Sequence, residues 1–420
     1  MRYFIWRLAF SFLFVGSGQM LFAQVLGCTN PQAVNFQPRA KQNNGSCTYN
    51  PTAYKPFKSF ILPKEVNETS GLIFWRNSLW THNDSGGLPM LYRIDTVDGT
   101  VEQRIRVKNA TNTDWEELAA DSLYIYVGDF GNNSGHRHDL VIYKIRKSDI
   151  PTTGDDAVSS EKIFFQYPDY PVYIAKRSKN NYDCEAMIAV GDSLYLFSKD
   201  WQDSRTRVYR LPKTPGNYVA DLVDSFNTAG LVTAADYNRS KHKVVLLGYT
   251  RGNWAPFMWL LWDFKGHAFF SGNKRRIDMP AVTAPQTEGV TFTKGDDGFI
   301  SSEGRNPFFK PTAYHFDISP FTCANRPASV QHPITFTFTL HPNPVSKRTV
   351  SIYLVNLPEK EYSLKLYDSS GKQIIPLHYD TFSKRGKIII KLRISKLKTG
   401  TYFVRIQSGK YTVEHKFIRE

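Results

Sequence analysis

The sequence predicts an all-β protein: a β-propeller of five blades, with six blades as the alternative, followed by a small antiparallel β-sandwich. Three observations favour this architecture. The chain of 420 residues is rich in Phe, Tyr and Trp and lacks long helical periodicity. A strand–turn–strand unit recurs between Ser70 and Phe321. Apolar and polar residues then alternate with a period of two near the C-terminus, as in half-buried strands.

Each repeat opens with a short phrase of polar, small and apolar residues that leads into an apolar run and a Gly-rich turn. The phrases start roughly 45 to 70 residues apart, a spacing typical of propeller blades. They are Ser70-Gly71-Leu72, Glu116-Glu117-Leu118, Glu185-Ala186-Met187, Thr233-Ala234-Ala235 and Glu288-Gly289-Val290.

The segment Pro56 to Leu62 is expected to close the propeller. The fifth repeat meets Pro320 before it can supply an outer strand, and an N-terminal strand added to the last blade would remove the open edge. A strand from the long second repeat, residues 151–181, could instead build a sixth blade.

The N-terminus has the form of a secretory signal. Arg2 and Arg7 precede the apolar run Leu8 to Phe22, which is followed by a small-residue cleavage position. We expect no transmembrane segment in the mature chain.

The expected parts of the chain are a signal peptide at 1–23, a disulfide-linked segment at 24–53, the propeller at 54–323, a linker at 324–338 and the sandwich at 339–420.

The formal charge of +15 does not indicate a nucleic-acid partner. Much of the excess positive charge lies between Leu340 and Glu420, where Lys and Arg alternate with apolar residues as on the solvated face of a sheet.

Export permits disulfides, and Cys28 is expected to pair with Cys47. Cys184 and Cys323 are expected to be free buried thiols, with their mutual pairing as the alternative.

The stretch from Cys28 to Cys47 resembles short Cys-paired modules of exported proteins from bacteria that use type IX secretion. The resemblance rests on GCTNPQAVNFQP and NNGSCTY. Acidic positions in those modules imply calcium, but this chain has Gln42-Asn43-Asn44-Gly45 there, without a carboxylate. A structural staple is therefore favoured.

The C-terminus resembles the type A C-terminal sorting domain of type IX secretion. The motifs are His341-Pro342-Asn343-Pro344, Leu366-Tyr367-Asp368 with Gly371-Lys372, Gly400-Thr401-Tyr402 with Val404-Arg405-Ile406, and the ending Lys416-Phe417-Ile418-Arg419-Glu420. This resemblance implies recognition by the type IX machinery, and a secreted protein or one on the outer surface of a Gram-negative cell.

Candidate site residues form two rings around one mouth of the predicted propeller, where inner strands start and second strands end. In the inner ring, three glutamates are candidate ligands for a divalent cation such as calcium, beside Ser70 and Thr233. They are Glu116, Glu185 and Glu288. The second ring supplies candidate ligand-binding residues: His82, Asp84, Asp129, Asp200, Arg251, Glu303 and Arg305, with Asn83, Asn132 and Lys199 beside them.

Several interpretations of these rings stay open. The carboxylates could bind backbone N–H groups and hold the blades in register, coordinate a cation, or act as general acid and base on glycosidic or phosphoester bonds. Trp201 and Trp254 lie in or beside the turns and could stack on a carbohydrate. The sequence contains no Gly-x-Ser-x-Gly, P-loop, paired CxxC or HExxH motif.

The central region resembles secreted bacterial propellers distantly similar to esterase-like phytases. The likeness rests on Asp114 to Ala119, on Gly128-Asp129-Phe130-Gly131-Asn132 and on Thr287-Glu288-Gly289. The expected function is binding of an extracellular ligand at an acidic mouth, and the alternative is a hydrolase that uses the same carboxylates.

Overall fold

The computed structural model shows a chain of two compact units, Met1–Arg326 and Pro327–Glu420. Strands dominate both units, so the prediction of an all-β chain is confirmed. The predicted signal peptide lies outside the described residues. Among the described residues, no helix has the length and apolar character needed to cross a bilayer. The structure describes residues 25–171, 173–176, 179–282, 286–305, 309–322, 337–341, 344–346, 348–355, 361–384, 387–408 and 411–420.

The larger unit contains five sheets of four or five strands, which we number in chain order of their first strands. Sheet 1 runs β4 (Thr69–Trp75), β5 (Ser78–Asn83), β6 (Met90–Ile94), β7 (Val101–Val107) and β11 (Asp156–Val158). Sheet 2 runs β8 (Trp115–Ala120), β9 (Tyr124–Asp129), β10 (Val141–Arg146), β12 (Glu161–Gln166) and β16 (Gly216–Val219).

The other three sheets have four strands each. Sheet 3 runs β13 (Cys184–Val190), β14 (Ser193–Ser198), β15 (Thr206–Pro212) and β17 (Asp221–Phe226). Sheet 4 runs β18 (Leu231–Asn238), β19 (Lys243–Tyr249), β20 (Pro256–Trp262) and β21 (Asn273–Asp278). Sheet 5 runs β22 (Thr287–Phe292), β23 (Asp297–Ser302), β24 (Thr312–Asp317) and β3 (Phe57–Ile61). The short helices are η1 (Lys64–Val66), η2 (Lys147–Asp149) and α1 (Ser319–Thr322).

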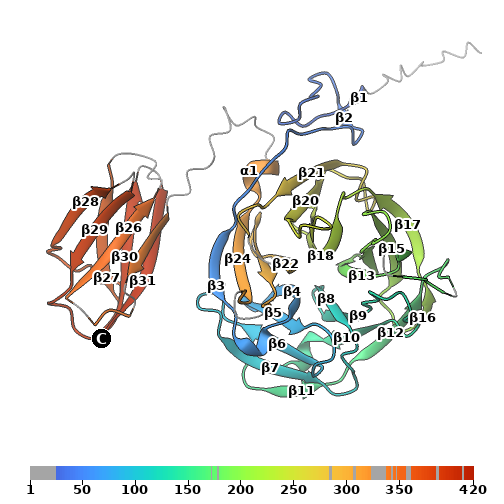
Figure 1. The fold of residues 1–420 in the computed structure, drawn as a ribbon, viewed down its shortest axis with the longest axis horizontal. Coiled ribbons are helices and arrows are strands. Elements are labelled where there is room, and N and C mark those ends of the chain that lie inside the picture. The colour runs from blue at the N-terminus through green and yellow to red at the C-terminus, as the bar shows by residue number, and fades with distance from the viewer. Residues whose placement is uncertain are drawn as a thin grey trace, which may run out of the picture. The chain divides into compact units, whose positions relative to one another are not determined.

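The first strands of the five sheets form a closed ring around one axis (Figure 1). Strand β4 contacts β8 and β22, and β13 and β18 complete the circle between them. The ring closes through β3, which pairs antiparallel with β24. Residues 151–181 supply β11 and β12, which add outer strands to sheets 1 and 2.

Each pair of neighbouring sheets shares one buried apolar cluster. Between sheets 1 and 2, for example, Trp80 and Leu91 pack with Val127 and Ile145. Equivalent clusters lie between sheets 2 and 3, 3 and 4, 4 and 5, and 5 and 1. Burial of one such large side chain contributes about 1.5–3 kcal/mol to stability. Because every pair of neighbouring sheets buries several of them, the apolar core is distributed around the ring.

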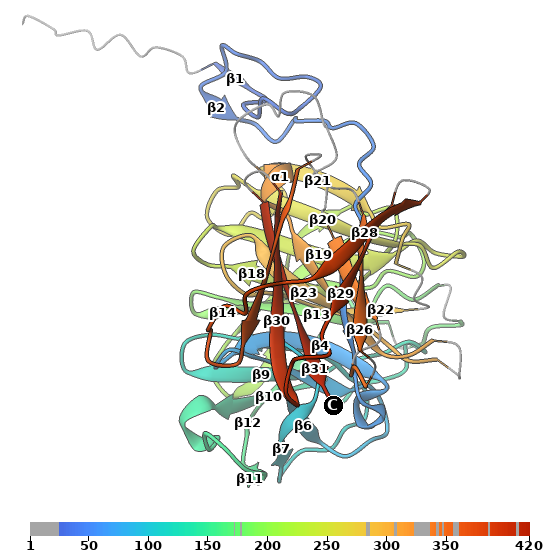
Figure 2. The same ribbon diagram turned by 90° about the vertical axis from the view of Figure 1, so that its left-hand side faces the viewer.

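The N-terminal segment is stapled and packs on sheet 4 (Figures 1 and 2). The predicted disulfide between Cys28 and Cys47 is confirmed, with a Cα–Cα distance of 4.8 Å. The Tyr49 ring lies 5.8 Å from that of Trp262, and Asn43 donates a hydrogen bond to Asp263 at 2.8 Å. Strands β1 (Leu26–Gly27) and β2 (Gln42–Asn43) pair within it.

Of the other two cysteines, Cys184 is buried and free. Cys323 lies outside the described residues, so its expected state as a free buried thiol stays a prediction.

The smaller unit has two antiparallel sheets that enclose one apolar cluster. Ile352 and Leu392 come from one sheet, and Leu366 and Val404 from the other. Two residues of the predicted linker, Thr337 and Phe338, already belong to its first strand. One sheet contains β25 (Thr337–His341), β26 (Thr349–Val355), β29 (Lys387–Arg393) and β28 (Tyr379–Lys384), and the other β27 (Ser363–Asp368), β30 (Gly400–Ser408) and β31 (Tyr411–Arg419).

Candidate functional site

A β-bulge recurs at the same place in all five inner strands. In each strand the register with its neighbour slips by one residue near the start, which leaves a single residue unpaired. A bulge of this kind bends the strand and redirects the extra side chain. The unpaired residues are Gly71, Glu116, Glu185, Thr233 and Glu288.

The first repeat differs from its expected alignment by one residue. Gly71, and not Ser70, is equivalent to Glu116. Ser70 Oγ donates a hydrogen bond to the Glu116 carbonyl oxygen at 2.8 Å, and Thr233 Oγ1 donates to the Thr287 carbonyl oxygen at 2.6 Å. These two hydroxyls therefore tie neighbouring inner strands together.

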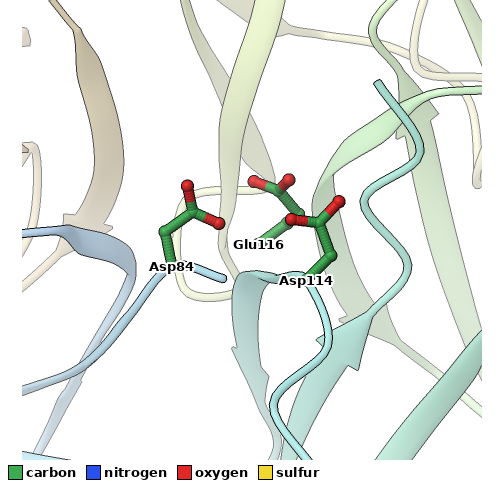
Figure 3. A group of neighbouring side chains, drawn as sticks. All are labelled: Asp84, Asp114 and Glu116. Carbon is green, nitrogen blue, oxygen red and sulfur yellow. The ribbon is translucent and has the colours of Figure 1, made fainter. Parts of the chain in front are cut away.

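Seven carboxylates gather where the inner strands begin, and we call this group the carboxylate cluster and this end of the axis the acidic mouth. Within each of three triads, one carboxylate oxygen from every residue lies within 4.8 Å of the others. Figure 3 shows the carboxylates of one triad converging on a common space. The triads are Asp84, Asp114 and Glu116; Asp84, Glu288 and Glu303; and Glu116, Asp183 and Glu185.

The bulges explain why residues from different sheets can meet here. Asp114 and Asp183 each stand two residues before a bulged glutamate, at the starts of β8 and β13. Gly131 lets the chain pass close beside them, because a Cβ there would lie 2.2 Å from Glu116 Oε1 and 2.4 Å from Asp114 Oδ2. Any larger residue at Gly131 would displace one triad.

Lys199 neutralises one of the three triads. Its ammonium, only 2% exposed, donates a hydrogen bond to Glu185 Oε1. Burial alone would lower the pKa of Lys199, but Glu185 and Asp183 raise it well above the usual value. Asp183 also accepts hydrogen bonds from the Asn132 backbone N–H and the Trp201 indole N–H, both at 2.7 Å. Asp183 therefore already has its donors, whereas Glu185 Oε2 is buried without a hydrogen-bond partner in the described part of the chain.

In the described part of the chain, no Lys or Arg forms an ion pair with the two triads that share Asp84. Asp84 Oδ1 is buried and has no hydrogen-bond partner in the described part of the chain. Burial, together with Glu288 and Asp114, raises the pKa of Asp84 to about 8. Burial and Glu303 raise that of Glu288 to about 8. Without a bound cation, these carboxyls hold protons at neutral pH.

The remaining carboxylates of these triads shift in the same direction. Burial raises the pKa of Glu303 to about 7 and that of Asp114 to about 6, with Asp183 adding to the second shift. Burial and Glu185 raise the pKa of Glu116 well above its usual value. A group of ionised carboxylates at this separation requires a cation, so the cluster can exist either protonated or loaded.

Asp129 supports the cluster from outside it. It accepts hydrogen bonds from the backbone N–H groups of Thr113 and Asp114 and pairs with Arg137 at 2.9 Å. Asp200 is likewise outside the triads and pairs with Arg207. Of the expected second ring, Asp84 and Glu303 thus join the cluster while these two aspartates do not.

His82 is fully buried and does not belong to any triad. Its Nδ1 lies 2.9 Å from the Asn83 carbonyl oxygen and its ring meets that of Trp115 edge-on. Burial lowers the pKa of His82 to about 4, so the ring is neutral. A Cβ on Gly71 would lie 2.7 Å from His82 Nε2. In sheet 1, the imidazole thus occupies the space into which a bulged side chain would extend.

The two arginines of the expected second ring are also outside the triads. Arg251 donates to the Trp201 carbonyl oxygen, and Arg305 is exposed. Trp201 is 8% exposed and packs with Leu231 and Tyr249, whereas Trp254 is 38% exposed. Of the two tryptophans expected to stack on a sugar, Trp254 alone offers an open face.

Sequence reasoning missed Asp114 and Asp183 as members of the cluster. A signal was present, because Asp-x-Glu occurs before both bulges and Gln286-x-Glu288 occupies the same place in sheet 5. The Gln286 amide donates to Glu288 Oε1.

Comparison with known proteins identifies the C-terminal part. Residues 339–420 match the family described as the secretion system C-terminal sorting domain. A search of curated proteins gives no match. The expected likeness to esterase-like phytases stays a prediction.

Two solved structures give weak similarity. Hydrazine synthase of Kuenenia stuttgartiensis is 10% identical with a TM-score of 0.33, covering 84% of this chain and 97% of that one. A GH43_1 enzyme from Xanthomonas citri is 11% identical with a TM-score of 0.38, covering 60% of this chain and 88% of that one. Similarity this low assigns no activity to the chain. The matched sorting domain, however, shows that this is a secreted or cell-surface protein that carries a type IX secretion signal.

Proposed function

We propose that the larger unit is a five-bladed β-propeller that binds a divalent cation at the acidic mouth and, through this cation, an extracellular ligand. The observation that carries the proposal is Asp84. It belongs to two triads at once, and one of its carboxylate oxygens is buried without a hydrogen-bond partner in the described part of the chain. A buried carboxylate oxygen without a donor is costly unless a proton or a cation satisfies it.

The composition of the triads favours calcium or a similar hard cation. All their ligand atoms are carboxylate oxygens, with no His or Cys among them. Calcium takes six to eight oxygens at about 2.3–2.6 Å, so ligands on either side of one ion lie up to about 5 Å apart. The 4.8 Å spread within a triad fits this geometry. Softer metals such as zinc would prefer nitrogen or sulfur ligands.

The position of the cation would leave an open side for a ligand. Glu116 and Glu288 are each 3% exposed, whereas Asp84 and Asp114 are only partly buried. A cation held by these four residues would therefore be reached past the two aspartates. Hydroxyl or carboxylate oxygens of an extracellular molecule, including a carbohydrate, could complete its coordination.

Hydrolysis is the second candidate function, and one observation favours it. Asp84 and Asp114 lie side by side, yet the pKa of Asp84 is about 8 and that of Asp114 about 6. At pH 7 one carboxyl is then protonated and the other ionised, which is what a general acid and a general base require. Glycosidic and phosphoester bonds are the substrates that this pair suits.

Metal titration of the full secreted chain separates the two functions. We expect calcium, manganese or magnesium to bind in calorimetry, and Asp84→Asn to weaken binding at least tenfold. Asp155→Asn, which removes an exposed carboxylate directly before β11, should leave binding unchanged. Absence of binding by all three metals at millimolar concentration would contradict the cation site. Turnover of glycosides or phosphoesters that Asp84→Asn abolishes would instead establish the hydrolase.

We propose that passage from the periplasm across the outer membrane depends on the sorting domain. Deletion of residues 340–420 should leave the protein in the periplasm, because the type IX machinery would no longer recognise it. Cell fractionation and immunoblotting measure this directly. Normal secretion of the truncated chain would show that another signal directs export.

A further inference from the structure

A cavity lies where the five inner strands end, and we call this end of the axis the far mouth. Its volume is about 300 Å³. All five inner strands line it, one residue from each being Phe74, Ala120, Ala189, Asn238 and Phe292. Because the carboxylate cluster lies at the starts of these strands, the two sites face opposite ends of the axis.

Glu117 separates the two mouths. Its side chain is fully buried. One carboxylate oxygen accepts the Leu118 N–H at 2.9 Å, and the other accepts the Ala235 N–H at 2.8 Å. These donors belong to sheets 2 and 4, which are not neighbours in the ring, so the bond crosses the axis. A ligand in the far mouth is therefore separate from the carboxylate cluster.

The carboxylates of the far mouth are already satisfied by the protein. Asp236 accepts hydrogen bonds from the N–H groups of Tyr237 and Phe292, both at 2.7 Å. Asp121 accepts two backbone N–H groups, the Tyr126 hydroxyl and the Lys213 ammonium, each at 2.9 Å. Neither aspartate has a free oxygen to offer a cation, in contrast to Asp84.

The cations of the far mouth are not satisfied in this way. Lys147 donates to the Asp121 carbonyl oxygen at 2.6 Å, which uses one of its three N–H donors. Arg239 is exposed at the rim and has no hydrogen bond or ion pair among the described residues. Burial, together with Arg239 and Arg76 and against Asp121, lowers the pKa of Lys147 to about 8. The positive groups therefore repel one another across the cavity.

We propose that the far mouth binds a small oxyanion, a phosphate or carboxylate group, between Lys147 and Arg239. An oxyanion would accept the unused N–H donors of both side chains and remove their mutual repulsion. The volume is near the lower end of the range for small-molecule sites, so it fits a free ion or the charged end of a small metabolite. This site does not depend on a cation at the acidic mouth.

Inorganic phosphate, sulfate and succinate are the probes for the test, added to the full chain in about 0.1 M salt. We expect at least one of them to bind in calorimetry and to raise the melting temperature. Lys147→Met and Arg239→Gln should each weaken that binding tenfold or more. Because Arg239 is exposed, its variant keeps the fold even if the Lys147 variant is destabilised. The affinities measured for phosphate and for succinate show whether the site prefers a phosphate or a carboxylate group.

Two controls make the test specific. Lys58→Met removes the same charge from the exposed face of β3 and should leave binding unchanged. Asp84→Asn alters the opposite mouth and should also leave it unchanged. The proposal is overturned if none of the probes binds at 20 mM or less, or if Lys147→Met and Arg239→Gln bind as tightly as the unaltered chain.

Discussion

The two mouths of the ring are built from the same five strands, yet they present opposite chemistry. Both contain carboxylates. At the far mouth every carboxylate oxygen of Asp121 and Asp236 has a protein donor, whereas Asp84 at the acidic mouth keeps one oxygen without a partner in the described residues. The comparison teaches that the presence of acidic residues does not define a cation site. What matters is which oxygens the fold leaves without a donor.

Lysines show the same contrast from the other side. Lys199 at the acidic mouth is 2% exposed and bonded to a carboxylate, and the surrounding acids raise its pKa above the usual value in spite of burial. Lys147 at the far mouth bonds to a carbonyl group, and burial with neighbouring arginines lowers its pKa to about 8. One ammonium acts as an internal counterion, and the other is free to meet an anion.

The largest effect on the free energy of unfolding is expected when Lys199 is replaced by methionine, and the same replacement at Lys147 should cost much less. Lys199→Met leaves Glu185 buried without its counterion and should cost about 3–5 kcal/mol of unfolding free energy in the cation-free protein. Lys147→Met loses one hydrogen bond to a carbonyl group and should cost about 1 kcal/mol. Urea unfolding of both full-length variants measures the difference. Equal losses would show that the two mouths do not differ as described.

Substitution of Glu117, which separates the two mouths, should have the next largest effect on the free energy of unfolding. Glu117→Gln offers one carbonyl oxygen to two backbone N–H groups, so one buried donor is left unpaired. We expect a loss of about 1–3 kcal/mol in the same unfolding experiment. Glu102→Gln, on the outer strand β7 of sheet 1, is the matched control and should cost less. A neutral result at Glu117 would mean that its carboxylate does not tie sheets 2 and 4 together.

The pH dependence of stability distinguishes the cation-free from the loaded acidic mouth. Folding raises the pKa values of Asp114, Glu303, Asp84 and Glu288 to about 6, 7, 8 and 8. The folded chain then binds more protons than the unfolded chain, so stability falls as the pH rises from about 4 to 8.5. We expect melting in EDTA to be lower at pH 8.5 than at pH 5. Calcium should remove most of this fall, and a rise in EDTA would contradict the protonated cluster.

The smallest effect is expected at Arg305. Its side chain is exposed and outside the triads, so solvent and salt screen its charge from the cluster. Arg305→Gln should change cation affinity less than twofold in calorimetry. A tenfold change would show that Arg305 lies much closer to the bound ion than it does to the carboxylate cluster in the structure described above.

Much of the architecture could be predicted from the repeat phrases. They marked all five inner strands, and the shortage of strands in the last repeat indicated the role of the segment that forms β3. A strand from residues 151–181 was expected only as part of a sixth blade, and the places of β11, β12 and β16 in sheets 1 and 2 were not predicted. Strand β11 pairs in parallel with β7 and β16 pairs in parallel with β12, and such pairings depend on tertiary contacts and not on local pattern.

The site could be predicted only in outline. Asp84 and Asp129 look alike in the sequence, since each follows an apolar run and precedes a Gly-rich turn. In the structure, Arg137 and two backbone N–H groups satisfy Asp129, while Asp84 Oδ1 has no partner among the described residues. Which carboxylate receives donors depends on loop conformation. The one-residue offset at Gly71 had the same origin, because a bulge cannot be located from composition.

The most direct test of the cation site is a calcium titration of the unaltered chain and of Asp84→Asn at pH 7.5, followed by calorimetry and by metal analysis after gel filtration. We predict that the unaltered chain retains calcium and that the variant, though folded, binds it at least tenfold more weakly. Equal binding by both chains would contradict the central claim that Asp84 joins two carboxylate triads into a cation site.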